Sequence, residues 1–247
     1  MEHFTIIGSL FLAFANYRGD INKHKTSSMI YKMDESTGIF TLYQTLQTRG
    51  PHGLEHFSIA DKHFLAVANY YDGTHQLDSV IYQWNGKMFV VFQKLSTKGA
   101  VHFAFFTING DNYLAVANYY DGSTHSIKSV IYKWSSGKFN KFQEIATEGA
   151  MGCTAFVINN DTFIAFANHY YSQQKYSVQS TVFKWSGGQF VKLQSLQTYG
   201  AWDVTSLLMP TLELAPTPIP LFTSGMAAGL FCSSPLLLEH PVLSIHL

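Results

Sequence analysis

One block of sequence occurs four times in this chain at a nearly constant interval. Each copy is an apolar run of five residues followed by asparagine, and the four asparagines are separated by 53, 49 and 50 residues. The copies are residues 11–16, 64–69, 113–118 and 163–168, which end on Asn16, Asn69, Asn118 and Asn168. A tandem repeat of this length is typical of solenoids and propellers, so it constrains the fold of the whole chain.

Two further blocks follow the first in every unit. The second reads Ser-Val-Ile-Tyr-Lys-Trp at 129–134, with variants at 28–33, 79–84 and 181–185. The third begins with phenylalanine, has glutamine four residues later and ends with glycine. Its copies are marked by Phe40, Phe89, Phe139 and Phe190, by Gln44, Gln93, Gln143 and Gln194, and by Gly50, Gly99, Gly149 and Gly200.

Each unit is predicted to form four strands. It contains four short runs rich in Phe, Tyr, Val and Ile, which are separated by turn residues and lack helical periodicity. In the second unit we expect strand A at 56–60, B at 64–69, C at 79–84 and D at 88–95. Asn85-Gly86 and Asn109-Gly110 indicate tight type I′ hairpin turns. A four-stranded antiparallel meander in tandem copies is a propeller blade, so the predicted fold class is an all-β, β-propeller type with blades at about 1–53, 54–102, 103–153 and 154–205.

These blocks resemble the EAR repeat family, also named EPTP. The resemblance rests on Ala-Asn after an apolar strand, on Ser-Val-Ile-Tyr-Lys-Trp, and on Phe-x-x-x-Gln with a later Gly-Ala or similar pair, and it covers residues 3 to about 205. The segment Ala-Asn-Tyr-Tyr-Asp-Gly most resembles the repeats of those family members that also carry a thrombospondin-type laminin G domain. The resemblance implies a seven-bladed propeller in an extracellular or cell-surface protein that acts by binding other proteins.

The chain departs from that pattern in its number of units and in its last segment. Four units are present where the resemblance implies seven, so we expect an open or incomplete array of blades. The open faces should lie around Phe4, Leu12 and Phe14 in the first blade and around Phe183, Trp185 and Phe190 in the fourth. Residues 209–247 form a Pro-rich, apolar tail that we do not assign to the repeat.

Composition excludes several classes of function. The chain has 16 Lys+Arg against 16 Asp+Glu, so it lacks the positive charge with which nucleic-acid binders neutralise phosphates. No Lys or Arg precedes the apolar run near the N-terminus, which therefore does not match a signal peptide. The uncharged segment 221–238 contains two glycines and a proline, so we do not expect membrane contact. Two cysteines, Cys153 and Cys232, provide no disulfide framework and no zinc site.

Alternation of strand direction sorts the loops between the two ends of the propeller. The B–C and D–A connections should emerge at one end, and the A–B and C–D turns at the other. We expect the long B–C loops to be the binding surface, because recognition residues concentrate on loops held by a rigid scaffold. The candidate binding residues are Tyr70, Tyr71, Asp72, His75, Tyr119, Tyr120, Asp121, His125, His169, Tyr170 and Tyr171.

A purely structural interpretation of the same residues stays open. The tyrosines could pack between blades, and Asp-Gly at 72–73 and 121–122 could serve only as turn residues. Each repeated asparagine is expected to cap strand B by bonding to the loop backbone. Asn160 begins an Asn-Asp-Thr glycosylation sequon in an A–B turn.

Catalytic and metal chemistry find little support in the sequence. The acids are few and scattered, and no nucleophile and base form a recognisable pair, so we expect no enzyme and no cofactor. Gly53, His102, Gly152 and Asp203 occupy equivalent D–A positions around the expected channel, where only Asp203 is a good calcium ligand. We therefore predict no metal site.

The sequence thus predicts a non-enzymatic, secreted or cell-surface interaction module. Its expected partner is an extracellular or cell-surface protein, in receptor signalling or adhesion. A carbohydrate-binding propeller, in which tyrosine and aspartate contact a glycan, is an alternative. A truncated, non-functional fragment of a larger EAR-repeat protein is another.

Overall fold

The computed structural model describes residues 1–19, 23–170, 176–207 and 242–246, and every regular element in these ranges is a β-strand. Within them, no helix is long and apolar enough to cross a membrane. Tyr171, Cys232 and the apolar segment 221–238 lie outside the described residues. The predicted all-β class is therefore confirmed.

Four sheets of four strands form the body of the molecule, and each sheet is built from consecutive antiparallel strands. Blade one contains β1 (Glu2–Ile6), β2 (Ser9–Phe14), β3 (Lys25–Met33) and β4 (Phe40–Arg49). Blade two contains β5 (Pro51–Ile59), β6 (Lys62–Asn69), β7 (Gln76–Trp84) and β8 (Phe89–Lys98). Blade three contains β9 (Ala100–Ile108), β10 (Asp111–Asn118), β11 (Ser126–Ser135) and β12 (Lys138–Glu148). Blade four contains β13 (Ala150–Ile158), β14 (Asp161–Asn168), β15 (Ser177–Ser186) and β16 (Gln189–Tyr199).

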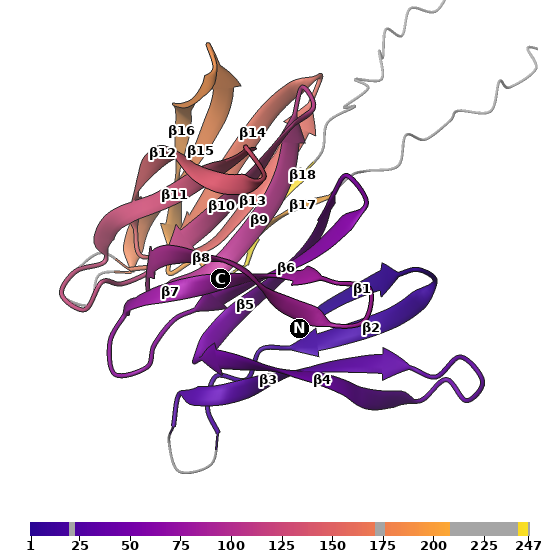
Figure 1. Ribbon diagram of the computed structural model, residues 1–247. Helices are drawn as coiled ribbons and strands as arrows, with labels where there is room; N and C mark the ends of the chain where they lie inside the picture. Colours follow the sequence, from indigo (N-terminus) through magenta and orange to yellow (C-terminus); the bar gives the residue numbers. More distant parts are fainter. Residues whose placement is uncertain (20–22, 171–175, 208–241, 247) are drawn as a thin grey trace, which may run out of the picture.

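The blades follow one another in chain order around a line of inner strands (Figure 1). Contacts join β1 to β5, β5 to β9 and β9 to β13, so the first strand of each unit is the inner one. A further strand, β17 (Asp203–Leu207), lies against β13 in the position of a fifth inner strand, and β18 (Val242–His246) pairs with it antiparallel. The end of the segment 209–247, which the sequence set apart from the repeat, thus contributes one strand beside the fifth unit. No comparable contact joins β1 to β13 or β17 among the described strands, which form an arc.

Glycines mark where one blade ends and the next begins. Gly50, Gly99, Gly149 and Gly200 have positive φ angles of 51°, 52°, 55° and 63°, a conformation that costs glycine little. Three of the four are followed directly by the first strand of the next blade. The expected boundaries after residues 53, 102 and 153 are therefore three or four residues late. Strand A of the second unit begins at Pro51 rather than 56, because polar and glycine residues there still take part in the sheet.

The two predicted hairpin turns have different outcomes. Asn109 and Gly110 have φ angles of 50° and 85° and connect the paired residues Ile108 and Asp111, as a type I′ turn requires. The prediction for Asn85-Gly86 is wrong. The ladder there closes at Trp84 and Phe89, which leaves a loop of four residues. The Asn85 side-chain oxygen accepts hydrogen bonds from the backbone N–H groups of residues 87 and 88 and so stabilises the wider loop.

Aromatic side chains at the repeated positions fill the space between blades, as the sequence predicts. Trp134 of blade three lies 5.5 Å from Phe64 and 5.7 Å from Phe92 of blade two, measured between ring centroids. Trp84 and Trp185 lie against the preceding blade in the same way. Phe64, Leu65, Leu114 and Ile131 are fully buried in these junctions. The junctions therefore form the hydrophobic core.

Most of the aromatic residues expected on the open faces of blades one and four are packed against a neighbouring blade instead. Phe4 is 5% exposed and stacks on His56 of blade two, and Phe183 and Phe190 are buried in the junction with blade three. On blade four, Phe156 and Phe163 face β17 instead. Successive strand residues point to opposite faces, so the error comes from assigning the wrong alternate set to the neighbouring blade. Phe14, at 39% exposed, does lie on an open face.

Candidate binding end

The B–C loops and D–A connections lie together at one end of the molecule, which we name the aromatic end. One pocket there is lined by residues of both regions, including Tyr70 and Tyr119 from B–C loops, His52 from the start of β5 and Trp202 from the D–A connection before β17. The sorting of loops between the two ends is therefore confirmed. The two-residue A–B turns, such as 109–110, lie at the other end of the same strands.

Each repeated asparagine holds a B–C loop in place. The Asn69 side-chain nitrogen donates to the backbone oxygen of Asp78 at 2.9 Å, and equivalent bonds of 2.8–2.9 Å occur at Asn16, Asn118 and Asn168. The capping role is confirmed, and a second role was missed. The Asn69 side-chain oxygen accepts from the backbone N–H of Arg49 in the preceding blade at 3.0 Å. The loops are thus fixed both within and between blades.

The residue after each asparagine lies in a row across the aromatic end. Ring centroids are 6.2 Å apart for Tyr17 and Tyr70, 6.1 Å for Tyr70 and Tyr119, and 5.8 Å for Tyr119 and His169. The structure brings together three predicted site residues, Tyr70, Tyr119 and His169. Tyr17 was missed, although its position after Asn16 aligns it with Tyr70. Tyr70 and Tyr119 also pack on the core of blades three and four, as the structural interpretation predicts, and their role in binding stays a prediction.

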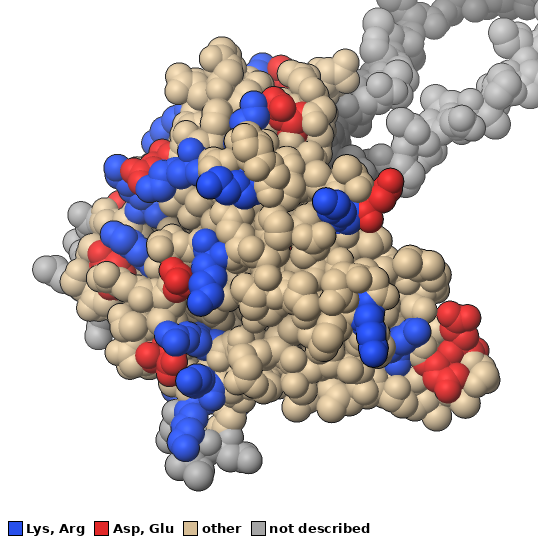
Figure 2. Space-filling view, in the orientation of Figure 1, with Lys and Arg blue, Asp and Glu red and all other residues tan. Residues whose placement is uncertain are grey.

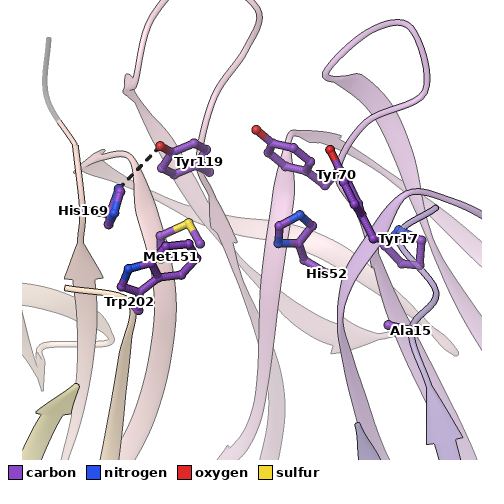
Figure 3. Close-up of a pocket in the computed structure, with 9 residues that line it drawn as sticks. Ala15, Tyr17, His52, Tyr70, Tyr119, Met151, His169 and Trp202 are labelled. Atoms are coloured by element: carbon purple, nitrogen blue, oxygen red, sulfur yellow. Dashed lines mark hydrogen bonds between the residues drawn. The ribbon is translucent and has the colours of Figure 1, made fainter. Parts of the chain in front are cut away.

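These residues line a pocket of about 450 Å³. In Figure 3, Tyr119, His169, Met151 and Trp202 lie on one side of it, and Tyr70, His52, Tyr17 and Ala15 lie on the other. His52, Met151 and Trp202 share one D–A position, two residues after the junction glycine. The sequence did not indicate these three residues, because they belong to three different residue types and so show no repeated pattern. The D–A position that we considered in the sequence, occupied by Gly53, Gly152 and Asp203, is one residue further along the chain.

A second set of aromatic contacts links consecutive blades outside the pocket. Centroids of Tyr71 and His24 are 4.9 Å apart, those of Tyr120 and His75 are 4.9 Å apart, and those of Tyr170 and His125 are 4.4 Å apart. In each pair the histidine belongs to the preceding blade. Tyr71, Tyr120, Tyr170, His75 and His125 are thus predicted site residues that join blades at the aromatic end, beside the pocket.

The two predicted aspartates take part in loop structure. Asp121 accepts hydrogen bonds at 2.9 Å from the backbone N–H groups of Ser123 and Thr124. These bonds hold the pKa of Asp121 below its usual range. Its carboxylate also lies 4.0 Å from the Lys98 ammonium, and Asp72 lies 3.8 Å from the Arg49 guanidinium. The turn interpretation therefore accounts for Asp121 without a ligand.

The pocket is electrically neutral at pH 7. Burial raises the pKa of Tyr119 to about 12 and raises that of Tyr70 further, so both phenols stay protonated. Burial also lowers the pKa of His52 and His169, which are therefore uncharged. No Lys, Arg, Asp or Glu is among the residues that line the pocket. Such a site offers aromatic faces, phenol hydroxyls and imidazole nitrogens, without a charged side chain.

Two acids, Glu55 and Asp203, lie on the inner strands β5 and β17. Glu55 accepts a hydrogen bond from the backbone N–H of Phe105 at 2.8 Å, and burial raises its pKa to about 7. The charges of Glu55 and Asp203 both act on the buried Cys153, whose sulfur lies 3.8 Å from His102 Nδ1. A side chain at Gly152 would lie 2.6 Å from an Asp203 oxygen. Within the described ranges, no three His, Cys, Asp or Glu residues form a group that could hold a metal ion.

The glycosylation sequon lies at the end opposite the pocket. Asn159 and Asn160 form the two-residue turn between Ile158 and Asp161, and Asn160 is exposed with a φ angle of 65°. On the face of the molecule shown in Figure 2, Lys and Arg lie beside Asp and Glu. Lys128 and Glu144 form a 2.6 Å ion pair.

Comparison with solved structures supports the fold. The chain is similar to an exo-beta-1,3-galactanase from Clostridium thermocellum, with a TM-score of 0.52 and 8% identity over 83% of this chain and 50% of that one. It is also similar to a GH93 alpha-L-arabinofuranosidase of Fusarium graminearum, with a TM-score of 0.52 and 11% identity over 77% and 63% of the two chains. Both are β-propeller proteins, and at such low identity the likeness extends to the fold alone.

Comparison of sequences identifies the repeat. A human protein described as thrombospondin-type laminin G domain and EAR repeat-containing protein is 45% identical over 85 residues, which are 34% of this chain and 13% of that protein. This chain therefore matches only a small part of its relative. The EPTP domain matches residues 39–85, 88–135 and 138–186, which together make up more than half of the chain. Each match spans strand D of one blade and strands A to C of the next, and on this basis the chain belongs to the EPTP domain family.

Proposed function

We propose that this chain is a non-enzymatic module that binds an extracellular or cell-surface protein through its aromatic end. The observation that carries the proposal is the gathering of tyrosine, histidine and tryptophan side chains around one pocket, on loops fixed by hydrogen bonds within and between blades. Tyrosine and tryptophan give large contact areas at a low entropic cost, and they are enriched where proteins bind each other. Trp202 is 55% exposed and Tyr176 is 48% exposed, so part of this surface is open to a partner.

The extracellular location is part of the proposal. Its support is the human relative, whose name includes a thrombospondin-type laminin G domain. A role in receptor signalling or adhesion follows from the same resemblance. A glycan attached to Asn160 would be consistent with an extracellular location. The sequon is exposed and lies at the end opposite the aromatic end, so a glycan there would leave the proposed binding surface free.

The test compares two exposed apolar residues at opposite ends. Trp202→Ala removes a side chain at the pocket, and Val157→Ser changes a residue that is 50% exposed near the A–B turns. The purified chain is screened against a set of human cell-surface ectodomains by surface plasmon resonance. We expect a protein partner whose affinity falls at least tenfold with Trp202→Ala and is unchanged with Val157→Ser. The reverse order would place the binding surface at the other end and contradict the proposal.

Carbohydrate binding is the second candidate, and one observation favours it. The hydroxyl groups of Tyr17 and Tyr70 have no hydrogen-bond partner among the described residues, so they could bond to sugar hydroxyls while the rings stack on a sugar face. A glycan array separates the two candidates. Carbohydrate binding would be supported if the chain binds a defined glycan, if Tyr70→Ala abolishes that binding, and if no protein partner is found. Tyr71 and Tyr120 are less suitable for this test, because their loss would also disturb the junctions between blades.

A further inference from the structure

The inner strands differ in charge from the rest of the molecule. The strands β1, β5, β9, β13 and β17 contain three acids, Glu2, Glu55 and Asp203, and no Lys or Arg. The whole chain, in contrast, has equal numbers of basic and acidic residues. The inner strands therefore hold acidic side chains that no Lys or Arg of the same strands balances.

These acids interact with one another across blades. The charge of Glu2 in blade one contributes to the raised pKa of Glu55 in blade two. Asp203 directly follows Trp202, which lines the pocket. Negative potential in a site with low-dielectric walls attracts positively charged ligands. The field from the inner strands thus favours a cation at the pocket, whose own lining carries no charge.

The aromatic lining suits a cation as well. Cations bind to the faces of Trp and Tyr rings, and arginine does so more often than lysine because its planar guanidinium can stack. Three tyrosines and one tryptophan line the pocket. A contact of this kind already occurs within the chain, where the guanidinium carbon of Arg18 lies 5.3 Å from the centroid of the ring of Tyr17, a residue that lines the pocket. The phenol oxygens of Tyr17 and Tyr70 could in addition accept hydrogen bonds from a guanidinium group.

We propose that the pocket formed by Tyr17, Tyr70, Tyr119 and Trp202 receives an arginine side chain of the partner protein, with the acids of the inner strands attracting its charge. This inference rests on the proposed function and specifies the chemistry of the group that the aromatic end recognises. An arginine side chain is long and unbranched up to its guanidinium group, so it fits a pocket of about 450 Å³ at the aromatic end. The guanidinium then lies between the two walls seen in Figure 3.

The test uses two small probes of nearly the same shape. N-acetyl-arginine methylamide carries the guanidinium, and the citrulline analogue replaces it with a neutral urea group. Each is titrated into the full chain and followed by NMR shifts of the tryptophan indole protons. We expect the arginine probe to bind at least tenfold more tightly than the citrulline probe. Equal binding of the two probes, or tighter binding of a neutral methyl glycoside, would overturn the proposal.

Variants locate the site and test the role of the acids. Trp202→Leu should weaken the arginine probe at least fivefold, and Val157→Ser should leave it unchanged. Glu55→Gln keeps the acceptor for the Phe105 N–H and removes the charge, so it should weaken the arginine probe two- to threefold without changing the citrulline probe. Loss of probe binding in Val157→Ser, or no change in Trp202→Leu, would contradict the assigned place. Circular dichroism confirms that each variant is folded.

The pH dependence separates the acids from the pocket histidines. The titratable groups at the pocket are His52, His169 and the three tyrosines. The other titratable groups of the inner strands are Glu2, His3, Glu55, His56, His102, Cys153 and Asp203. Burial lowers the pKa values of His52 and His169 and raises those of Tyr70 and Tyr119. Because burial raises the pKa of Glu55 to about 7, Glu55 is the acid expected to ionise between pH 6.5 and 8. The arginine probe should bind more tightly at pH 8 than at pH 6.5 in the wild type, and equally at both in Glu55→Gln. A rise with pH that persists in Glu55→Gln would exclude Glu55 as the cause.

The two levels of proposal fail in different ways. If a protein partner depends on Trp202 but the two probes bind equally, the arginine inference is wrong and the proposed function stands. If the arginine probe binds and no protein partner depends on the aromatic end, the proposed function is wrong while the cation pocket remains.

Discussion

Gln93 of blade two and Phe139 of blade three are joined by two hydrogen bonds. The Gln93 side-chain nitrogen donates to the Phe139 carbonyl oxygen at 2.7 Å, and the Gln93 side-chain oxygen accepts from the Phe139 N–H at 2.9 Å. The same pair of bonds joins Gln44 to Phe89 and Gln143 to Phe190. At these three junctions the repeated Phe-x-x-x-Gln motif thus connects one blade to the next, since the glutamine side chain satisfies both the N–H and the C=O of a phenylalanine in the following blade.

Removal of this bridge is expected to destabilise the protein strongly. Gln93→Ala leaves the N–H and the C=O of Phe139 without partners in a partly buried junction, at a cost of about 1–3 kcal/mol for each group. We expect a loss of about 2–4 kcal/mol in the free energy of unfolding, measured by urea denaturation. Gln194→Ala is the matched control. Gln194 holds the equivalent position in blade four but has no hydrogen-bond partner among the described side chains, so its loss should cost less than about 0.5 kcal/mol. Equal losses in the two variants would contradict this account.

Junction glycines should be less tolerant of substitution than loop glycines. Gly99 and Gly73 both have positive φ, at 52° and 76°. A methyl group at Gly99 would lie 2.5 Å from the Tyr120 carbonyl oxygen, whereas one at Gly73 would meet no atom within 4 Å. Gly73→Ala should therefore cost about 1 kcal/mol from backbone strain alone. Gly99→Ala should cost about 3 kcal/mol or more, because blade three must shift. Thermal denaturation of the two variants checks this order, and a larger loss for Gly73→Ala would reverse it.

Stability should depend on pH through Glu55. Burial raises the pKa of Glu55 to about 7, so between about pH 4.5 and 7 the folded state holds a proton that the unfolded state has lost. Stability from this group is therefore full at low pH and is lost as the pH rises, by up to about 3 kcal/mol. His56 opposes it, because burial lowers its pKa to about 4 and the unfolded state binds the proton first.

A difference measurement isolates the Glu55 contribution from that of His56. The free energy of unfolding of the wild type minus that of Glu55→Gln is measured by urea denaturation at pH 5, 6, 7 and 8. We expect this difference to fall mainly between pH 5 and 7 and only slightly between pH 7 and 8. A difference that rises with pH would mean that Glu55 is stabilised as a carboxylate.

Glycosylation at Asn160 should leave the aromatic end free. Expression in a secreting eukaryotic cell should give a species whose electrophoretic mobility changes on treatment with an amide-cleaving glycosidase, and Asn160→Gln should abolish that change. Partner affinity of Asn160→Gln should equal that of the wild type, because the A–B turn lies at the opposite end from Trp202. A large loss of affinity would indicate that the partner contacts the A–B turns.

Much of the fold could be predicted because the same pattern of strands and turns occurs four times in the sequence. Asn69, Asn118 and Asn168 end their strands as expected, and Asn16 lies two residues after the end of β2. All four make the expected side-chain bond to the loop backbone, which is a local property of the repeat. The faces of the outer blades were assigned wrongly, because alternation gives two sets of side chains and does not say which set meets the neighbour. Phe4 shows this, since it faces blade two rather than the open side.

The candidate site was predicted only in part, for a related reason. Tyr70, Tyr119 and His169 come from the repeat and could be predicted, but other residues on both sides of the pocket come from positions where the units differ. His52, Met151 and Trp202 occupy one structural position with three different residue types, so the repeat gives no signal there. Their proximity follows from the arrangement of blades around the inner strands, which local sequence does not encode.

The most direct test of the aromatic end as a binding surface is hydrogen–deuterium exchange of the chain with and without its bound protein partner. The account predicts slower exchange on binding in the B–C loops that follow Asn16, Asn69 and Asn118 and in the D–A connection at Ala201 and Trp202. The A–B turns at 60–61, 109–110 and 159–160 should exchange at the same rate in both states. Slower exchange confined to those A–B turns would contradict the account.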